Sequence, residues 1–342
     1  MSLKDGRTAF VKQKFDERFN PNEEFLGLNK TVNHNEPLVS VCVPAYQHEQ
    51  FIAECLESIL SQKTNFTYEV LIGEDESRDR TREICKEYAK KHTDKIRLFL
   101  RDRKTSQLYD ETGEFLYRFN VKWLRLSARG KYIALCEGDD YWTYKYKLQK
   151  QVDFLEDHPD YSTCFHNAKV IYTDKSDAHP FSTIKEGEYT GIQIYENRLI
   201  PTASVVFVAA CAENKDYFFN SNFFFGDLVL FLTLAESGKL WYFNEIWSVY
   251  RKHEGGMMHD VFEDPENVRK FIIHQKQIIK TFPDKYKKTG HKMVSWFYFI
   301  LFRKTFKKDP FGSLGSLLKS FWYSWSRCAE LSIKFIRTRF GF

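Results

Sequence analysis

The strongest constraint on the fold is the alternation of short apolar runs with helix-like segments over residues 38–100. Residues 38–43, 68–73 and 96–100 have the length and the β-branched content of buried strands. Residues 48–62 and 79–91, which lie between them, carry apolar side chains at the intervals of an amphipathic helix. Parallel strands need such crossovers, so the pattern predicts an α/β fold with a mostly parallel sheet flanked by helices.

The rest of the chain extends this pattern. Residues 131–136 form an apolar run expected to be a central strand, between helices at 120–128 and 145–158. Further strands are predicted at 160–173, 201–208 and 240–248, and a helix at 228–236. Residues 101–119 are polar and predicted to be irregular. Helices are predicted at 264–282 and 284–308. A last helix is expected to have one apolar face made of Leu314, Leu317, Leu318, Phe321, Trp325, Cys328, Phe335 and Ile336.

Charge divides the chain into an acidic body and a basic tail. Residues 285–342 carry 13 Lys and Arg against 2 Asp and Glu, whereas residues 1–284 carry 38 against 44. The basic, aromatic last helix is typical of a membrane-surface element. The alternative is a helical cap on the main domain with a solvated basic side. Nucleic acid is not predicted as a partner, because the body is acidic and no nucleic-acid motif is present.

The cysteines and the apolar runs indicate in which cellular compartment the protein is expected. The seven cysteines are an odd number without a C-x-x-C pair, which predicts reduced, buried thiols in a cytoplasmic protein, with neither a disulfide framework nor a zinc site. The first residues lack the apolar core of a signal peptide. The longest apolar runs are shorter than the ~20 residues of a membrane helix. We therefore expect a protein that does not cross a membrane, with peripheral attachment to the inner face of the plasma membrane as the open alternative.

Three carboxylates follow the central strand. Glu137, Asp139 and Asp140 come directly after the apolar run, at the carboxyl end of the strand where open α/β sheets bind ligands. Carboxylates this close repel one another unless a cation or a proton lies between them, which favours a divalent metal. The alternative is an acidic turn that caps the next helix, and the spacing alone slightly favours that turn.

The ends of the first two strands offer groups that suit a nucleotide. Neither G-x-G-x-x-G nor the P-loop pattern follows a strand, so a nucleotide would be held by other means. Asp75 follows the second strand, and its carboxylate can accept the imide N–H of a uracil. Tyr46 follows the first strand, where an aromatic ring can stack on a base. The alternatives are helix capping for Asp75 and ordinary packing for Tyr46.

Taken together, three motifs resemble the inverting family-2 glycosyltransferases with the GT-A fold. The motifs are VSVCVPAY at 39–46, EDESRDRT at 74–81 and ARGKYIALCEGDDYW at 128–142, and the resemblance covers about residues 37–255. It implies a GT-A fold, with a Rossmann-like sheet and a C-terminal helical extension. It implies nucleotide contacts at Pro44, Tyr46 and Asp75. It also implies a Mn²⁺ or Mg²⁺ site at Asp139, where Glu137 and Asp140 assist in donor binding.

Two positions depart from the family pattern. Glu137 stands where Asp is common, so its carboxylate reaches one methylene further. Glu76 stands where Gly is usual, which weakens the expectation of a tight turn after the second strand.

The resemblance also assigns roles in the second half of the chain. Asp227 corresponds to the acidic residue that takes the proton from the acceptor hydroxyl, although an N-cap is the simpler interpretation from local sequence. Arg251 and His253 resemble the R-x-H loop that closes over the diphosphate. Arg251 would contact phosphate, and His253 would contact phosphate or serve as a metal ligand. A surface histidine is the alternative for His253.

These assignments predict three regions and a function. The regions are an N-terminal extension at 1–36, a GT-A catalytic domain at 37–260 and a basic, aromatic helical region at 261–342. The predicted activity is metal-assisted, inverting transfer of a sugar from a nucleotide-sugar, UDP-linked by expectation, to a hydroxyl of a glycan or lipid-linked glycan in surface polysaccharide synthesis. The alternative is a sugar-nucleotide-binding scaffold of the same fold with weak or no activity.

Overall fold

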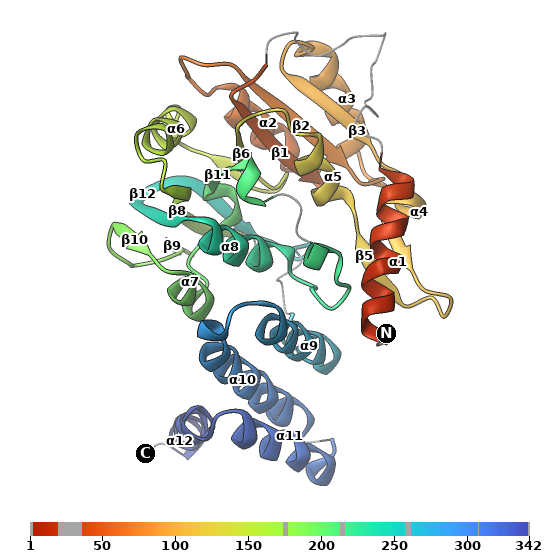
Figure 1. Ribbon diagram of the computed structural model, residues 1–342, viewed down its shortest axis with the longest axis vertical. Helices are drawn as coiled ribbons and strands as arrows, with labels where there is room; N and C mark the ends of the chain where they lie inside the picture. The colour runs from red at the N-terminus through yellow and green to blue at the C-terminus, as the bar shows by residue number, and fades with distance from the viewer. Residues whose placement is uncertain are drawn as a thin grey trace.

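A ten-stranded mixed sheet forms the centre of the molecule (Figure 1). The computed structural model describes residues 3–19, 36–173, 177–212, 216–256, 261–306 and 308–340. The strand order is β10-β12-β8-β11-β6-β1-β2-β3, with β7 paired to β12 and β9 paired to β8. The strands are β1 (Val39–Ala45), β2 (Tyr68–Glu74), β3 (Ile96–Leu100), β6 (Tyr132–Leu135), β7 (Tyr141–Trp142), β8 (Tyr161–Tyr172), β9 (Ala178–Pro180), β10 (Gly187–Tyr189), β11 (Val206–Val208) and β12 (Lys239–Lys252).

The first half of the sheet is parallel, as the alternating pattern predicts. Strand β1 pairs in parallel with β2 and β6, and β2 pairs in parallel with β3. The connections run through α2 (Ile52–Leu60), α3 (Thr81–Lys91) and α5 (Asn120–Ser127). Helix α2 buries Ile52, Cys55, Leu56 and Ile59 against the sheet, the face that its helical spacing predicts. The carboxyl ends of β1, β2 and β6 therefore lie side by side.

The second half of the sheet is mixed. Strand β11 runs antiparallel to both β6 and β8, while β8 and β12 are parallel. The predicted strand at 201–208 is shorter than expected, because the 3-10 turn η1 (Thr202–Ser204) precedes β11. Helices α2, α3 and α6 (Lys147–Asp157) cover one face of the sheet, and α5, α7 (Gly191–Asn197) and α8 (Gly226–Ser237) cover the other. The remaining short turns in this half are η2 (Ala209–Ala212) and η3 (Asp216–Phe219).

Residues 101–119 are not irregular, which corrects the sequence-based expectation. They form α4 (Arg103–Ser106) and a hairpin of β4 (Gln107–Tyr109) and β5 (Phe115–Arg118). Leu108 and Leu116 of this hairpin are buried against Val11 and Phe15 of α1 (Leu3–Arg18), which lies beside β5 in Figure 1. Residues 20–35 of the predicted N-terminal extension lie outside the described residues.

The C-terminal region is a group of helices at the end of the molecule remote from α2 and α3 (Figure 1). It contains α9 (Pro265–Thr281), η4 (Asp284–Tyr286), α10 (Lys287–Thr305), α11 (Pro310–Tyr323) and α12 (Trp325–Phe340). The predicted single last helix is thus two helices, separated at Ser324, whose φ of −160° is extended. Cys328 is buried, but Leu314, Leu318 and Trp325 of the predicted apolar face are exposed. The side chains of Phe335 and Ile336 lie outside the described residues.

Within the described ranges, no helix combines the length and the apolar character needed to span a bilayer.

Candidate active site at the carboxyl edge of the sheet

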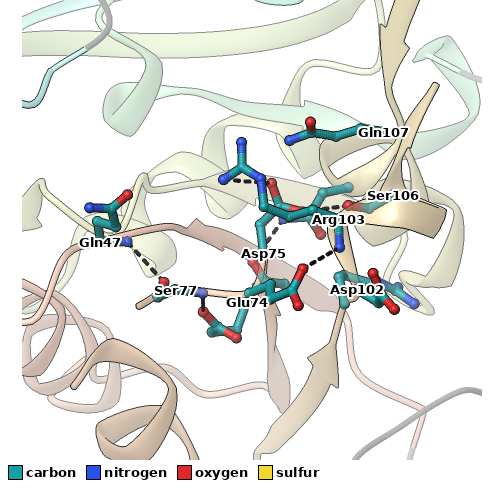
Figure 2. A network of polar contacts seen from close by, with 12 residues as sticks. Gln47, Glu74, Asp75, Ser77, Asp102, Arg103, Ser106 and Gln107 are labelled. Carbon is teal, nitrogen blue, oxygen red and sulfur yellow. Dashed lines mark hydrogen bonds and ion pairs between the residues drawn. The ribbon is translucent and has the colours of Figure 1, made fainter. Parts of the chain in front are cut away.

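Asp75 follows β2 directly and has a buried carboxylate. Its side chain is 2% exposed, and Oδ1 accepts a hydrogen bond from the Ser106 hydroxyl at 2.6 Å. Oδ2 is buried without a hydrogen-bond partner among the described residues, and Nη1 of Arg103 lies 3.9 Å away. Figure 2 shows these three side chains converging. A buried acceptor without a donor is costly, so Oδ2 is suited to receive an N–H from a ligand.

The neighbouring acid, Glu74, has a structural role. Its Oε1 accepts a hydrogen bond from the Ser77 backbone N–H at 2.7 Å, and Oε2 pairs with Arg82 of α3. The Ser77 hydroxyl in turn accepts from the Gln47 backbone N–H at 2.9 Å (Figure 2). Glu74 therefore ties the loops after β1 and β2 together and has no oxygen left for a ligand.

Tyr46, at the end of β1, presents its ring to Arg103. The guanidinium carbon of Arg103 lies 3.9 Å from the centre of the ring, a cation–π arrangement. Pro44 and Tyr46 are both half-buried, and Pro44 lies within β1. The edge of the sheet thus offers a flat aromatic face and a guanidinium next to the free oxygen of Asp75.

The position of Glu76 explains one departure from the family pattern. Its backbone has a φ of 58°, the left-handed conformation that favours glycine. The chain thus adopts, at a Glu, the backbone conformation that the Gly of the family pattern would favour. The Glu76 carboxylate accepts a hydrogen bond from the Arg103 backbone N–H at 2.8 Å, so this side chain holds the start of α4.

The acidic loop after β6 is pressed against the end of β1. The Gly138 backbone N–H donates to the Pro44 carbonyl at 3.0 Å. A Cβ on Gly138 would lie 2.8 Å from Nδ1 of His48 and 3.3 Å from Cβ of Ala45. Only glycine allows this close approach, which brings Asp139 next to His48.

Asp139 contacts two imidazoles. Its Oδ2 lies 3.1 Å from Nε2 of His253 and 3.7 Å from Nε2 of His48. Burial opposes ionisation of Asp139, but the hydrogen bond from His253 and the charge of His48 outweigh it and lower the pKa of this carboxyl. Burial lowers the pKa of His48, whose Nδ1 has no hydrogen-bond partner among the described residues. The structure thus joins a carboxylate, kept ionised, to two ring nitrogens.

The pKa values of Asp140 and Glu137 shift in the opposite direction to that of Asp139. Burial, and then the charges of their acidic neighbours, raise the pKa of both carboxyls. Asp140 is 2% exposed and accepts a hydrogen bond from the Arg251 backbone N–H at 2.9 Å, so it fixes the acidic loop to β12. Glu137 is half-buried and hydrogen-bonds the side chain of Thr202 in η1.

Arg251 holds the acidic loop from the opposite side. It lies within β12 and not in a loop after a strand, which corrects the sequence-based placement. Its side chain, 7% exposed, donates to the Asp139 carbonyl at 2.7 Å and pairs with Glu54 of α2. His253 follows directly after β12, where its ring meets Asp139.

Asp227 lies near enough to the acidic loop for its charge to act on Glu137. It is exposed in the first turn of α8, and its Oδ1 accepts a hydrogen bond from the Leu228 backbone N–H at 2.7 Å. The N-cap position is Phe225, so Asp227 is not the N-cap residue that local sequence suggests. The charge of Asp227 contributes, after burial and Asp139, to the raised pKa of Glu137. Burial and then the charges of Asp140, Glu137, Asp139 and Asp227 raise the pKa of Tyr250.

The residues fit a divalent cation held jointly with a ligand. No group of three or more His, Cys, Asp or Glu side chains is arranged to hold a metal in the ranges that the structure describes. Mg²⁺ and similar ions are, however, commonly held by one or two protein ligands together with substrate phosphates. Asp139 Oδ2 and His253 Nε2 provide two such donors.

Sequence reasoning missed several residues of this edge. Arg103 and Ser106 come from the segment that was expected to be irregular, and His48 and Glu54 come from α2 and the turn before it. The position of His48 shortly after the first strand was a usable signal, because that strand end belongs to the ligand-binding edge. No comparable local signal exists for Arg103.

Comparisons with known proteins concern the family and the fold of this chain. Residues 40–108 match the model of the family described as glycosyl transferase family 2. Rv1520, an uncharacterized protein of Mycobacterium tuberculosis, is 32% identical over 227 residues, which cover 66% of this chain and 62% of the relative. The chain thus spans less than two thirds of that relative's length. TuaG of Bacillus subtilis, a putative teichuronic acid biosynthesis glycosyltransferase, is 33% identical over 120 residues, which cover 35% of this chain and 42% of the relative.

The fold has a counterpart among solved structures. S. aureus TarS 1-349 in complex with UDP superposes with a TM-score of 0.57 at 16% sequence identity, covering 86% of this chain and 82% of that chain. At this identity the likeness concerns the fold alone. The family match over residues 40–108, the similarity to TuaG and the fold shared with TarS together show that this chain is similar to proteins of glycosyl transferase family 2 and has the GT-A fold.

Proposed function

We propose that this protein transfers a sugar from a UDP-sugar to a hydroxyl of a glycan or lipid-linked glycan, with inversion at the anomeric carbon. The observation that carries the proposal is the common environment of Asp139 and Asp227. Both carboxylates act on the pKa of Glu137 and of Tyr250, although Asp139 lies in the loop after β6 and Asp227 in the first turn of α8. A donor held at Asp139 would therefore lie within reach of an acceptor held at Asp227.

The base site favours uracil over guanine. Uracil offers a single imide N–H flanked by two carbonyl oxygens, whereas guanine offers two adjacent donors that need both oxygens of a carboxylate. Ser106 already occupies Oδ1 of Asp75, so one acceptor oxygen remains. Arg103 lies beside that oxygen as a donor for a uracil carbonyl, and Tyr46 offers a stacking face.

The chemistry is a single displacement. The acceptor hydroxyl oxygen forms a bond to the anomeric carbon while the bond from that carbon to the diphosphate oxygen breaks, and the electron pair leaves with UDP. The hydroxyl proton moves to the Asp227 carboxylate, which is exposed and therefore open to an acceptor. Asp139 and His253 would hold Mn²⁺ or Mg²⁺, which neutralises charge on the diphosphate when bound. Arg251 and Asp140 keep the loop that carries Asp139 in place.

The setting of the reaction is part of the proposal. Six of the cysteines, Cys42, Cys55, Cys85, Cys136, Cys164 and Cys328, are buried thiols, which suits a reducing cytoplasm. The relative TuaG is named for teichuronic acid biosynthesis, which supports a role in surface polysaccharide assembly.

A nucleotide-sugar panel tests the proposal. We expect release of UDP from a UDP-sugar in the presence of Mn²⁺ or Mg²⁺, little release from GDP-sugars, and loss of activity with EDTA. Asp227→Asn should lower transfer by about 10²- to 10⁴-fold and leave UDP binding, measured by calorimetry, nearly unchanged. Asp284→Asn, at an exposed carboxylate of η4, is the matched control. Retained turnover in Asp227→Asn would refute the assigned base, and UDP binding without any turnover would favour a scaffold.

A further inference from the structure

Helix α11 turns its polar side inward. Ser313 and Ser320 are its buried residues, with exposed fractions of 2% and 0%. The Ser320 hydroxyl donates to the Ser295 carbonyl of α10 at 2.8 Å, and the two hydroxyl oxygens lie 3.1 Å apart. The hydroxyl groups of Ser320 and Ser295 thus lie in the contact between α11 and α10, together with the ring of Tyr323, which stacks on Tyr298.

The outer side of α11 and the start of α12 are apolar. Phe311, Leu318, Trp322 and Trp325 are exposed by 87%, 69%, 86% and 72%, and Leu314 by 44%. Their spacing of three or four residues places Phe311, Leu314, Leu318 and Trp322 along one stripe of α11, and Trp325 follows after the break at Ser324. A helix on the surface of a soluble domain normally shows the opposite arrangement, with the apolar stripe inside. Contiguous apolar patches of this kind mark interaction surfaces.

The surroundings of this stripe are basic. Residues 310–323 contain one Lys and no acidic residue, and residues 285–342 carry 13 Lys and Arg against 2 Asp and Glu. Lys308 and Lys319 are exposed next to the stripe. A second copy docked on the same stripe would bring two basic surfaces together, whereas an anionic surface would complement them.

We propose that α11 and the first turn of α12 lie on the surface of an anionic lipid bilayer. Phe311, Leu314, Leu318, Trp322 and Trp325 enter the interfacial region, and Lys308 and Lys319 contact the headgroups. Trp and Phe beside Lys are the residue types that interfacial helices use. Each basic side chain near an anionic surface adds to the attraction, which salt weakens. This proposal is independent of the proposed transferase activity.

Vesicle binding tests the proposal. The full chain is sedimented with vesicles of phosphatidylcholine alone and of phosphatidylcholine mixed with phosphatidylglycerol. We expect binding to the mixed vesicles, weaker binding at high salt, and a blue shift of Trp fluorescence. Leu318→Ser/Trp322→Ser should lower the vesicle partition coefficient at least about tenfold, because two large apolar side chains are lost from the interface. Both residues are exposed, so circular dichroism should show an unchanged fold.

Matched variants separate the possible outcomes. Tyr146→Ser/Ile246→Ser removes one aromatic and one aliphatic residue with exposed fractions of 45% and 44% from the sheet domain, and should bind vesicles like the wild type. Lys308→Gln/Lys319→Gln should lose the preference for the anionic vesicles. The proposal is overturned if the wild type does not bind mixed vesicles, or if Leu318→Ser/Trp322→Ser binds them as well as the wild type. It is also overturned if lipid-free sedimentation velocity shows a dimer that this double variant abolishes, because the stripe would then be a self-association surface.

Discussion

Asp139 and His253 are joined by a contact of 3.1 Å between Oδ2 and Nε2, although 114 residues separate them in the chain. The carboxylate follows the parallel strand β6, and the imidazole follows β12 in the mixed half of the sheet. Arg251 and Asp140 reinforce this contact through hydrogen bonds between the same two segments. The candidate metal site therefore depends on how the two halves of the sheet are joined.

Asp139→Asn tests the metal ligand. The change keeps the size of the side chain but removes its charge, and an amide is a weaker ligand for a hard cation. We expect UDP to bind about 10- to 100-fold more weakly with Mn²⁺, and with unchanged affinity in EDTA, as measured by calorimetry. Asp157→Asn, at an exposed carboxylate at the end of α6, should leave both affinities unchanged. Mn²⁺-dependent binding equal to that of the wild type would contradict the assignment.

Ser106→Ala tests the selection of the base. The substitution frees Oδ1 of Asp75, so the carboxylate can accept both donors of a guanine. We expect the ratio of GDP to UDP dissociation constants to fall by about tenfold, which corresponds to one hydrogen bond. Thr105→Ala removes a neighbouring hydroxyl that donates to the Asp102 carbonyl, and should not change the ratio. If both variants keep the wild-type ratio of GDP to UDP dissociation constants, Ser106 does not determine the preference for uracil.

Glu76→Gly separates backbone strain from the positioning of Arg103. Glycine relieves a φ of 58°, worth about 1 kcal/mol, while loss of the hydrogen bond to the Arg103 N–H costs about as much. The free energy of unfolding should therefore change little. UDP affinity should fall several-fold, because α4 loses its anchor beside Asp75. Glu76→Gln keeps an acceptor and should retain most of the affinity. Equal affinities of the two variants would show that the anchor has no role in binding.

Lys147→Met tests a buried amine. Lys147 is 0% exposed, its Nζ has no hydrogen-bond partner among the described residues, and the Nζ lies 4.0 Å from the centre of the Trp142 ring. Burial lowers its pKa to about 7. Replacing it with an apolar side chain of similar length should raise the free energy of unfolding at pH 6 by about 2 kcal/mol.

The same variant gives a pH dependence with a definite sign. Between the folded pKa of about 7 and the unfolded value of 10.5, the unfolded chain binds more protons at Lys147 than the folded chain. Wild-type stability at this site therefore rises with pH across that window. The free energy of unfolding of Lys147→Met should exceed that of the wild type most below pH 7 and less at pH 9. Urea unfolding at pH 6 and at pH 9 measures this difference. If this difference is the same at both pH values, the Lys147 amine does not change its charge between them in the folded protein.

The predictable part of the structure follows from local patterns. The strands at 68–74, 96–100 and 161–172 and the helices after β1 and β2 are confirmed within a few residues, because each is long, apolar and regularly spaced. Parallel topology then places the ends of β1, β2 and β6 at one edge, so the proximity of Tyr46, Asp75 and Asp139 followed from their order in the chain.

The unpredicted part depends on packing between distant segments. The hairpin at 107–118 is stabilised by Val11 and Phe15 of α1, and no local pattern in residues 101–119 reveals that partner. The direction of the apolar stripe of α11 was also undecided, because a helical period defines a face but not what covers it.

By itself, the amino-acid sequence determined the α/β alternation and the acidic and aromatic residues at the strand ends, because both are properties of neighbouring residues. Only the tertiary structure decided that His48 and His253 meet Asp139, that Ser106 occupies one oxygen of Asp75, and that α11 faces outward. Those relationships join residues far apart in the chain, and they exist only when the packed sheet and helices hold them together.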